Sequence, residues 1–500
     1  MNMNSTISTI QFNLNPWHLG MSFEVHAYVK EIIHESKLQS QYIFLGNLNQ
    51  DLIPGNRPKS RFRQDSKNYK RIKFLNSLLY KNEFRDLVSQ SRELSCELFN
   101  ALINLDFFEI LDFVHQKEGI DASRAMKAVE LALIDKEKIW NVDSLHKNPN
   151  SIYLLKAYIR TFLSVREILK NSQHNYVNLF NTRFLDEGAA RDAALDLNSK
   201  IIEFEQVNSR SDSFGLFLES VHSSKERAAL VRNLKIKETK KAISSSIPSG
   251  RIWIEMRKKG VLQSFTKRQK KGKLPKLPDN KKIITCFLSS FDELILAGYV
   301  NTNSQFTQDN SLEAICSVLA REQDWHLVIR SHPNMLTRPK IEQRYWRKKL
   351  EHLDAQIIQP DDEVDSYALI EKSTLVLTFG STMGVEALAM GKASLLLGES
   401  LYSGLNLSWK LTSPKELKRF LDQPPGITNE QIDELNLYCE FQLFGGFRFR
   451  YLSVLPQDKF ELNPSLYYKG KLYFRNRSLI RSIREALKNS LANPLREKGD

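Results

Sequence analysis

Residues 375–388, LVLTFGSTMGVEAL, constrain the fold of this chain more than any other stretch. A short apolar, β-branched run, typical of a buried strand in a parallel sheet, ends at Gly380 and is followed by a helical pattern. Gly380 permits a tight turn, and Ser381 or Thr382 is placed to cap the helix. The free N–H groups at such a helix start favour a phosphate, and Glu386, one turn further on, is placed to accept from sugar hydroxyls. The stretch predicts a strand-turn-helix unit with a ligand at its turn, although an ordinary structural unit of an α/β protein explains it equally well.

The composition indicates a globular protein with more than one domain. The chain has 500 residues, 41% of them hydrophobic and 26% charged, so we expect two domains of roughly 200–250 residues. The sequence contains no apolar run of about 18 residues, and its first residues lack the features of a secretory signal. Its four cysteines lie far apart, without metal-ligand spacing. These features predict a cytoplasmic protein.

The formal net charge of +14 predicts an anionic partner. Zinc-finger, RNP and helix-turn-helix signatures are absent from the sequence, so we do not expect nucleic acid. Phosphorylated small molecules fit the charge, as does the anionic face of a membrane, and a basic surface that serves only solubility is the alternative. Residues 478–491 form a basic amphipathic pattern containing Arg481, Arg484 and Lys488, which either packs across the first domain or docks on the inner membrane.

The first half of the chain opens like an α/β sheet and then becomes mostly helical. Strand patterns at 6–14 and 42–45 precede a helical region at 69–170, and strands return at 176–180 and 201–207. Polar residues stand beside these strands, where open α/β sheets bind ligands. The candidates are His18 and Glu205 as catalytic groups and Trp17, Asn181 and Arg183 as substrate-binding groups, although an Arg–Glu pair at the surface explains Arg183 and Glu205 equally well.

The second half alternates regularly between strand and helix, which predicts a doubly wound parallel sheet. The expected strands are 283–288, 326–330, 356–359, 375–378 and 393–397, and the expected helices include 312–321, 342–352, 366–371 and 432–444. We therefore predict an N-terminal domain at 1–245, a basic linker at 246–282, a C-terminal domain at 283–430 and a helical segment at 431–500 that returns to the first domain.

Polar side chains follow three strands of the second domain, where the strands end. Because the carboxyl ends of parallel strands meet at one edge of a sheet, these groups are expected to line one crevice. Turn and helix-start roles are the alternative for His332, Asp292 and Glu293. The candidates for holding a nucleotide are Ser289, Ser290, Arg330, His332, Pro333, Asn334, Gly380, Ser381, Thr382 and Glu386, and the candidate catalytic residues are His332, Asp292 and Glu293.

The segments ITCFLSSFDEL, LVIRSHPN, VDSY and LVLTFGSTMGVEALAMGKASLLLG resemble capsule and surface-polysaccharide biosynthesis proteins, which are glycosyltransferases of the GT-B type. NLFNTRF followed by IIEFEQ is similar to the NGR…E pattern of this group, with Thr182 where the family has Gly. The resemblance covers residues 176–404 and implies two Rossmann-like domains facing across a cleft, the first carrying a helical insertion. It also implies that His332-Pro333 and Ser381-Thr382 hold the phosphate of a nucleotide-sugar donor.

This resemblance implies a cytoplasmic glycosyltransferase of surface-polysaccharide assembly, with a CMP-linked donor favoured and a glycan or lipid-linked acceptor. We expect neither a cofactor nor a metal, because a GT-B site works without one. The chemistry needs cationic or hydrogen-bonding groups at the leaving phosphate and, for inversion, a carboxylate or imidazole at the acceptor hydroxyl. The alternatives are a CDP-polyol phosphotransferase, a sugar-nucleotide epimerase on the same fold, and a non-catalytic GT-B scaffold that binds nucleotide or glycan.

Overall fold

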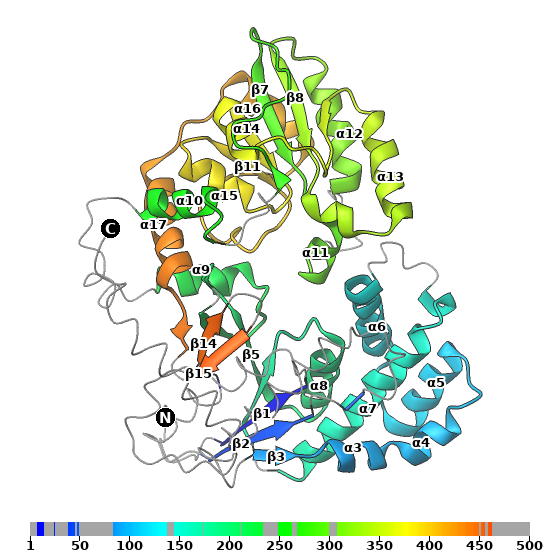
Figure 1. Ribbon diagram of the computed structural model, residues 1–500. Helices are drawn as coiled ribbons and strands as arrows, with labels where there is room; N and C mark the ends of the chain where they lie inside the picture. The colour runs from blue at the N-terminus through cyan, green and yellow to red at the C-terminus, as the bar shows by residue number, and fades with distance from the viewer. Residues whose placement is uncertain are drawn as a thin grey trace, which may run out of the picture.

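Two β-sheets, each with its own helices, form the two halves of the molecule, one above the other in Figure 1. The structure is a computed structural model, and the residues that it describes are 8–14, 25, 39–45, 48–49, 84–137, 145–172, 174–210, 212–233, 249–262, 268–299, 308–449, 452–455 and 459–462.

The sheet of the N-terminal half has the order β13-β6-β5-β4-β1-β2-β3. Strands β1 to β5 pair in parallel, whereas β6 and β13 are antiparallel additions at one edge. The first six strands thus follow the 3-2-1-4-5-6 order of a doubly wound sheet. The strands are β1 (Ser8–Asn13), β2 (Gln39–Phe44), β3 (Phe84–Asp86), β4 (Tyr176–Phe180), β5 (Lys200–Gln206), β6 (Ser213–Phe217) and β13 (Phe447–Arg448).

The helices of this half lie mainly between β3 and β4, where the sequence predicts a helical region. Helix α5 (Phe107–Glu118) begins with an Asp106 capping box and packs against its neighbours through an apolar face. The 20-residue helix α7 lies in the core with Tyr158 and Phe162 stacked on each other. The helices are α3 (Val88–Leu94), α4 (Cys96–Ala101), α5 (Phe107–Glu118), α6 (Ala122–Glu137), η2 (Leu145–Lys147), α7 (Ser151–Lys170), α8 (Leu185–Asp196) and α9 (Ser224–Arg232).

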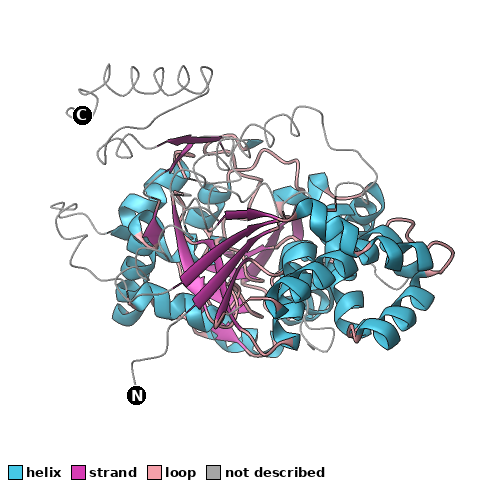
Figure 2. Cartoon of the chain, turned by 90° about the horizontal axis from the view of Figure 1, so that it is seen from below, coloured by secondary structure: helices cyan, strands magenta, loops and turns pink. Residues whose placement is uncertain are grey.

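The sheet of the C-terminal half is parallel throughout, in the order β12-β11-β10-β7-β8-β9. This is again the 3-2-1-4-5-6 order, and the apolar strand patterns of the sequence correspond to its central strands because helices cover both faces. Figure 2 shows strands fanning between the surrounding helices. The strands are β7 (Lys282–Phe287), β8 (Trp325–Arg330), β9 (Gln356–Ile358), β10 (Leu375–Thr378), β11 (Ser394–Leu397) and β12 (Trp409–Leu411).

The helices of the C-terminal half alternate with these strands, as the sequence predicts. Together with the two strand orders, this confirms the α/β architecture of two Rossmann-like domains. The helices are α11 (Phe291–Leu296), α12 (Gln308–Leu319), η5 (Pro333–Thr337), α13 (Lys340–Glu351), α14 (Ser366–Lys372), α15 (Met383–Ala389), η6 (Pro414–Glu416) and α16 (Leu417–Asp422).

The chain crosses between the halves through α10 (Ser249–Lys258) and returns through α17 (Asn429–Phe444). These two helices pack on each other, with Trp253 edge-on to Tyr438, and α17 also contacts α9. Beyond α17 the chain adds β13 to the N-terminal sheet, next to β6. A hairpin of β14 (Leu452–Leu455) and β15 (Lys459–Leu462) follows. Helix α17 therefore packs against both halves of the molecule.

Candidate active site

Three strand-to-helix junctions meet at one edge of the C-terminal sheet. β7 lies between β10 and β8, so the segments after these strands are neighbours. Ser289 Oγ, after β7, donates to the carbonyl of Phe379 after β10 at 2.9 Å. Asn334, after β8, donates through Nδ2 to Glu293 Oε1 of α11 at 2.6 Å. The structure thus brings together the polar groups that the sequence predicts at this edge.

A recess of about 40 Å³ lies at the junctions that follow β7, β8 and β9. Ser289, Ser331, His332, Gln359 and Asp361 contribute to its lining, with the apolar side of α13 behind them. Both hydroxyls are buried, and Ser331 Oγ has no hydrogen-bond partner among the described residues. The hydroxyl of Ser331 is therefore available to a polar ligand group that enters the recess, whereas that of Ser289 already donates to Phe379.

His332 is held in a defined orientation by the start of η5. Its Nδ1 accepts a hydrogen bond from the backbone N–H of Asn334 at 3.2 Å, so the ring proton of the neutral imidazole is on Nε2. Burial lowers the pKa of His332 to about 4, the net value after Asp292 raises it and Arg330 lowers it by smaller amounts. At neutral pH the ring is therefore an uncharged donor through Nε2–H.

Arg330 lies beneath the recess rather than across it. Its guanidinium donates to the backbone carbonyls of Gln359 at 2.7 Å and Asp362 at 3.1 Å, and the residue is buried. It therefore fixes the loop after β9, and its direct role at a phosphate stays a prediction.

Asp292 belongs to a buried ion cluster that ties α11 to η5 and α13. Arg338 lies 2.8 Å from Asp292 Oδ2 and 2.7 Å from Glu342 Oε2, and all three side chains are at most 7% exposed. Ser290 Oγ donates to Asp292 as well. Because an arginine holds its carboxylate in the interior, Asp292 stabilises the junction in this structure, and the expectation that it acts as a base stays a prediction.

The turn after β10 has the tight shape that the sequence predicts. Gly380 has φ +90°, and a Cβ there would lie 2.9 Å from the carbonyl of Glu399, so only glycine fits. Thr382 is the N-cap of α15 but donates to Glu386 Oε1 at 3.0 Å instead of capping, while Ser381 Oγ accepts from the N–H of Met383 at 3.3 Å.

Glu386 is completely buried in a network that joins three helices. Arg257 of α10 donates to Oε1 at 2.7 Å, and the hydroxyl of Tyr367 of α14 donates to Oε2 at 2.7 Å. The network fixes the crossover helix α10 against the start of α15. Binding of sugar hydroxyls by Glu386 stays a prediction, because solvent does not reach this carboxylate.

The N-terminal half contributes a second polar group, at the ends of β4 and β5. Asn181 donates through Nδ2 to Glu205 Oε2 and accepts through Oδ1 from His222 Nε2 at 3.2 Å. Burial raises the pKa of Glu205, although Asn181, Arg227 and Arg183 lower it. A half-buried carboxylate of raised pKa at a strand end is a suitable general base.

His222 is the residue of this group that sequence reasoning missed. It lies in the loop between β6 and α9, and its only sequence signal is an imidazole three residues after Glu219 and just before a helix. Burial lowers its pKa to about 3, with Arg183 and Arg227 adding to the effect. Its backbone carbonyl accepts from the hydroxyl of Tyr299 in the C-terminal half at 3.0 Å, so the group spans the two domains.

Thr182, the departure from the family's NGR triplet, has an evident packing role. Its hydroxyl donates to Glu203 Oε1 at 2.5 Å, and Glu203 Oε2 accepts from the N–H of Val221 at 3.1 Å. The threonine thus links the end of β4 to β5 and to the loop that carries His222.

The two neutral histidines predict a specific pH dependence of stability. Both ordinary pKa values are 6.5, and folding lowers them to about 3 for His222 and about 4 for His332. The unfolded chain therefore takes up protons first, so stability is constant above about pH 6.5 and falls towards pH 4. As the pH falls from 7 to 5.5, we expect each histidine to lower the free energy of unfolding by roughly 1 kcal/mol, as measured by urea unfolding. A variant with His222→Asn and His332→Asn should lose this part of the slope, and an unchanged slope would contradict the assignment.

Some expected features lie outside the described residues. These are the candidates Trp17 and His18 and the basic pattern at 478–491. Within the described part of the chain, His, Cys, Asp and Glu form no cluster suited to a metal ion. No helix in that part combines the length and apolarity needed to cross a membrane.

The fold and this edge-of-sheet geometry define an α/β protein of the GT-B type, with two doubly wound domains that face each other. Residues 268–427, which carry all three junctions, match the model of the family described as capsule polysaccharide biosynthesis protein. This match, over about a third of the chain, agrees with the resemblance found in its motifs. No curated protein matches the chain significantly.

Solved structures similar to the chain include KpsC of Thermosulfurimonas dismutans, described as a beta Kdo 2,4 transferase. It is 13% identical, with 53% of this chain and 79% of that chain covered and a TM-score of 0.33. A putative UDP-N-acetylglucosamine 2-epimerase from Listeria monocytogenes is 12% identical, with 89% and 93% covered and a TM-score of 0.26. UDP-GlcNAc 2-epimerase from Neisseria meningitidis, bound to UDP-GlcNAc, is 12% identical, with 87% and 96% covered and a TM-score of 0.24.

Proposed function

We propose that this protein is a glycosyltransferase of capsule polysaccharide synthesis that moves a sugar from a nucleotide-activated donor to a glycan or lipid-linked acceptor. One observation carries the proposal: the segment that matches the capsule family places an oriented, neutral His332 and buried hydroxyls at the carboxyl edge of a Rossmann-like sheet. Such an edge is where open α/β sheets bind nucleotides. A CMP-linked donor is the form that we favour.

The proposed roles follow from the charges that develop during transfer. The bond between the sugar's anomeric carbon and the donor phosphate breaks while a bond to the acceptor oxygen forms, and the leaving phosphate gains negative charge. His332 Nε2–H and the hydroxyl of Ser331 donate to this phosphate. If the reaction inverts the anomeric centre, Glu205 takes the proton of the acceptor hydroxyl.

Calorimetric titration with CMP, CDP, UDP, GDP and ADP tests the donor site. We expect one nucleotide to bind, and His332→Ala to weaken it at least about 10-fold, because a hydrogen bond to a charged phosphate is lost. His352→Ala, at an exposed position after α13, is the matched control and should bind normally. If no nucleotide binds to the folded protein, the transferase proposal fails and the non-catalytic scaffold is favoured instead. If polyol phosphate rather than sugar is released from donors, the reaction belongs to the phosphotransferase alternative.

A further inference from the structure

A cavity of about 390 Å³ lies between the two halves of the molecule, separate from the recess at His332. The N-terminal half supplies most of its wall, from α6, from the β4–α8 junction and from the loop before α9. The C-terminal half supplies the segment 296–298 at the end of α11. In Figure 1, α11 points down from the upper domain towards α6, which it contacts. The cavity is therefore a site that both domains complete.

The charged side chains that line this cavity are all basic. They are Arg124, Lys127, Arg183 and Arg191, and the described residues of the lining include no aspartate or glutamate. Thr182, Ser123 and Ser220 add polar groups to the wall. A cavity wall of this sign attracts an anion and repels a cation.

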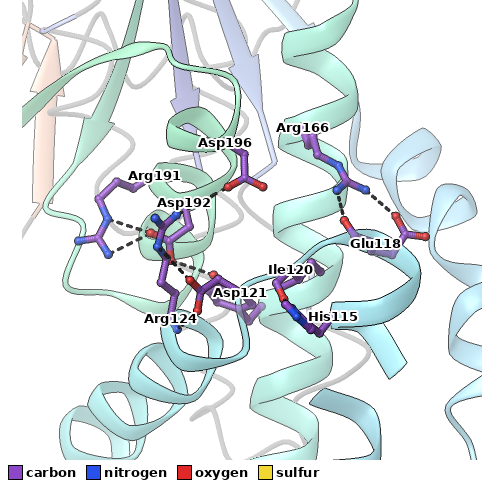
Figure 3. A network of polar contacts seen from close by, with 10 residues as sticks. His115, Glu118, Ile120, Asp121, Arg124, Arg166, Arg191, Asp192 and Asp196 are labelled. Atoms are coloured by element: carbon purple, nitrogen blue, oxygen red, sulfur yellow. Dashed lines mark hydrogen bonds and ion pairs between the residues drawn. The ribbon is translucent and has the colours of Figure 1, made fainter. Parts of the chain in front are cut away.

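The acids that partner these cations lie behind the wall. Arg124 is 3.7 Å from Asp196 and 3.8 Å from Asp121, and Arg191 is 3.1 Å from Asp192. Figure 3 shows this arrangement, in which the carboxylates fix the guanidinium groups without belonging to the cavity lining. The ion pairs thus hold Arg124 and Arg191 in place, while their remaining donors stay available to a ligand.

Arg183 differs from its neighbours because it forms no ion pair among the described residues and interacts with Glu205 only at longer range. Within the described part of the chain its guanidinium makes no hydrogen bond or ion pair, and its Nε is buried without a partner. The guanidinium lies 4.8 Å from the centre of the Phe184 ring, which holds it in place. A half-buried, oriented arginine without an ion-pair partner is well placed to bind an anion bidentately.

We infer that this cavity binds an oxyanion, a carboxylate or phosphate carried by the acceptor, with Arg183 as its main ligand and Arg191, Arg124 and Lys127 around it. The inference rests on the proposed function only in assigning the anion to the acceptor. The position fits that role, because the cavity shares His222 with the Glu205 group and adjoins the C-terminal end of α11. The N-terminal end of the same helix follows Ser289 and Ser290, so about 9 Å of helix separates the acceptor cavity from the donor junction.

Matched pairs of neutral and charged sugars test the cavity without any donor. The probes are methyl glucoside against methyl glucuronide, and glucose against glucose 6-phosphate, with binding measured by ligand-detected NMR. We expect the charged member of at least one pair to bind and its neutral partner not to bind. The pair that shows the difference distinguishes a carboxylate from a phosphate. Arg183→Ala should weaken charged-probe binding about 10- to 100-fold, because a charge-assisted hydrogen bond is lost.

Three controls keep this result separate from general charge effects and from the donor site. Arg344→Ala removes one positive charge from the exposed face of α13 and should leave probe binding within about twofold. Arg183→Lys, which keeps the charge, should restore part of the binding. Calorimetric titration of the nucleotide should be the same for wild type and Arg183→Ala, so loss of the donor site would be recognised independently. Equal binding of charged and neutral probes, or binding unaffected by Arg183→Ala, would overturn the inference.

Discussion

Replacing Arg338 by methionine is expected to lower the free energy of unfolding by about 3–5 kcal/mol. The side chain of Arg338 is 1% exposed and lies between two buried carboxylates, those of Asp292 and Glu342. Without the guanidinium, two buried carboxylates lose the cation that bridges them. Urea unfolding followed by tryptophan fluorescence measures the change, since Trp346 of α13 lies in the same core.

The same cluster predicts that removing all three charges is tolerated better than removing one. A triple variant with Asp292→Leu, Arg338→Met and Glu342→Leu should regain most of the lost stability, because the cost comes from unpaired charges rather than from missing pairs. Lys418→Met is the surface control: this lysine pairs with Asp422 and Glu322 but is 52% exposed, so its loss should cost less than about 1 kcal/mol. A single Arg338→Met variant as stable as wild type would show that the acids are not held as ions.

The parts of the fold that follow from apolar spacing could be predicted from the sequence. β4 spans 176–180 as expected, and β7 to β11 each lie within one or two residues of their predicted ranges, because buried parallel strands leave short, continuous apolar runs. β6 and α9 were not predicted. β6 contains Gly215 and a mixed pattern, and it is an antiparallel addition near the sheet edge, where burial constrains the sequence less.

The roles of the polar residues could be predicted only in part. The position of His332, Ser289 and Ser381 at one sheet edge follows from the parallel topology. The topology does not reveal which polar side chains are buried in the interior. Arg330 and Glu386 are examples, because their hydrogen-bond partners lie far away in the sequence. Glu386 binds Arg257, which is 129 residues away in the sequence, and no local sequence pattern predicts such a pair. His222 was missed for the same reason, since its contact with Asn181 depends on the fold.

Replacing Glu205 by glutamine is expected to reduce the turnover number of sugar transfer by about 10²–10⁴-fold, while nucleotide affinity stays unchanged. Glutamine keeps the size of the side chain and its contact with Asn181, but it cannot accept a proton. Burial raises the pKa of Glu205, so the wild-type rate should fall as the pH drops through a value above the ordinary 4.5 of a glutamate. The residual activity of Glu205→Gln should lack this acidic limb. If Glu205 were purely structural, the substitution would leave the shape of the pH–rate profile unchanged.

Glu203, two residues earlier on the same strand, provides the matched comparison. Both of its carboxylate oxygens already accept hydrogen bonds, from the Thr182 hydroxyl and from the Val221 N–H, and the residue is 3% exposed. Glu203→Gln should therefore lower stability, because its amide presents donors to groups that also donate, yet leave the acidic limb of the pH–rate profile in place. If both variants lose activity equally and keep the same pH profile, the base is not on β5. The proton acceptor must then be sought elsewhere in the cleft, first at His222, whose Nδ1 is buried without a hydrogen-bond partner among the described residues.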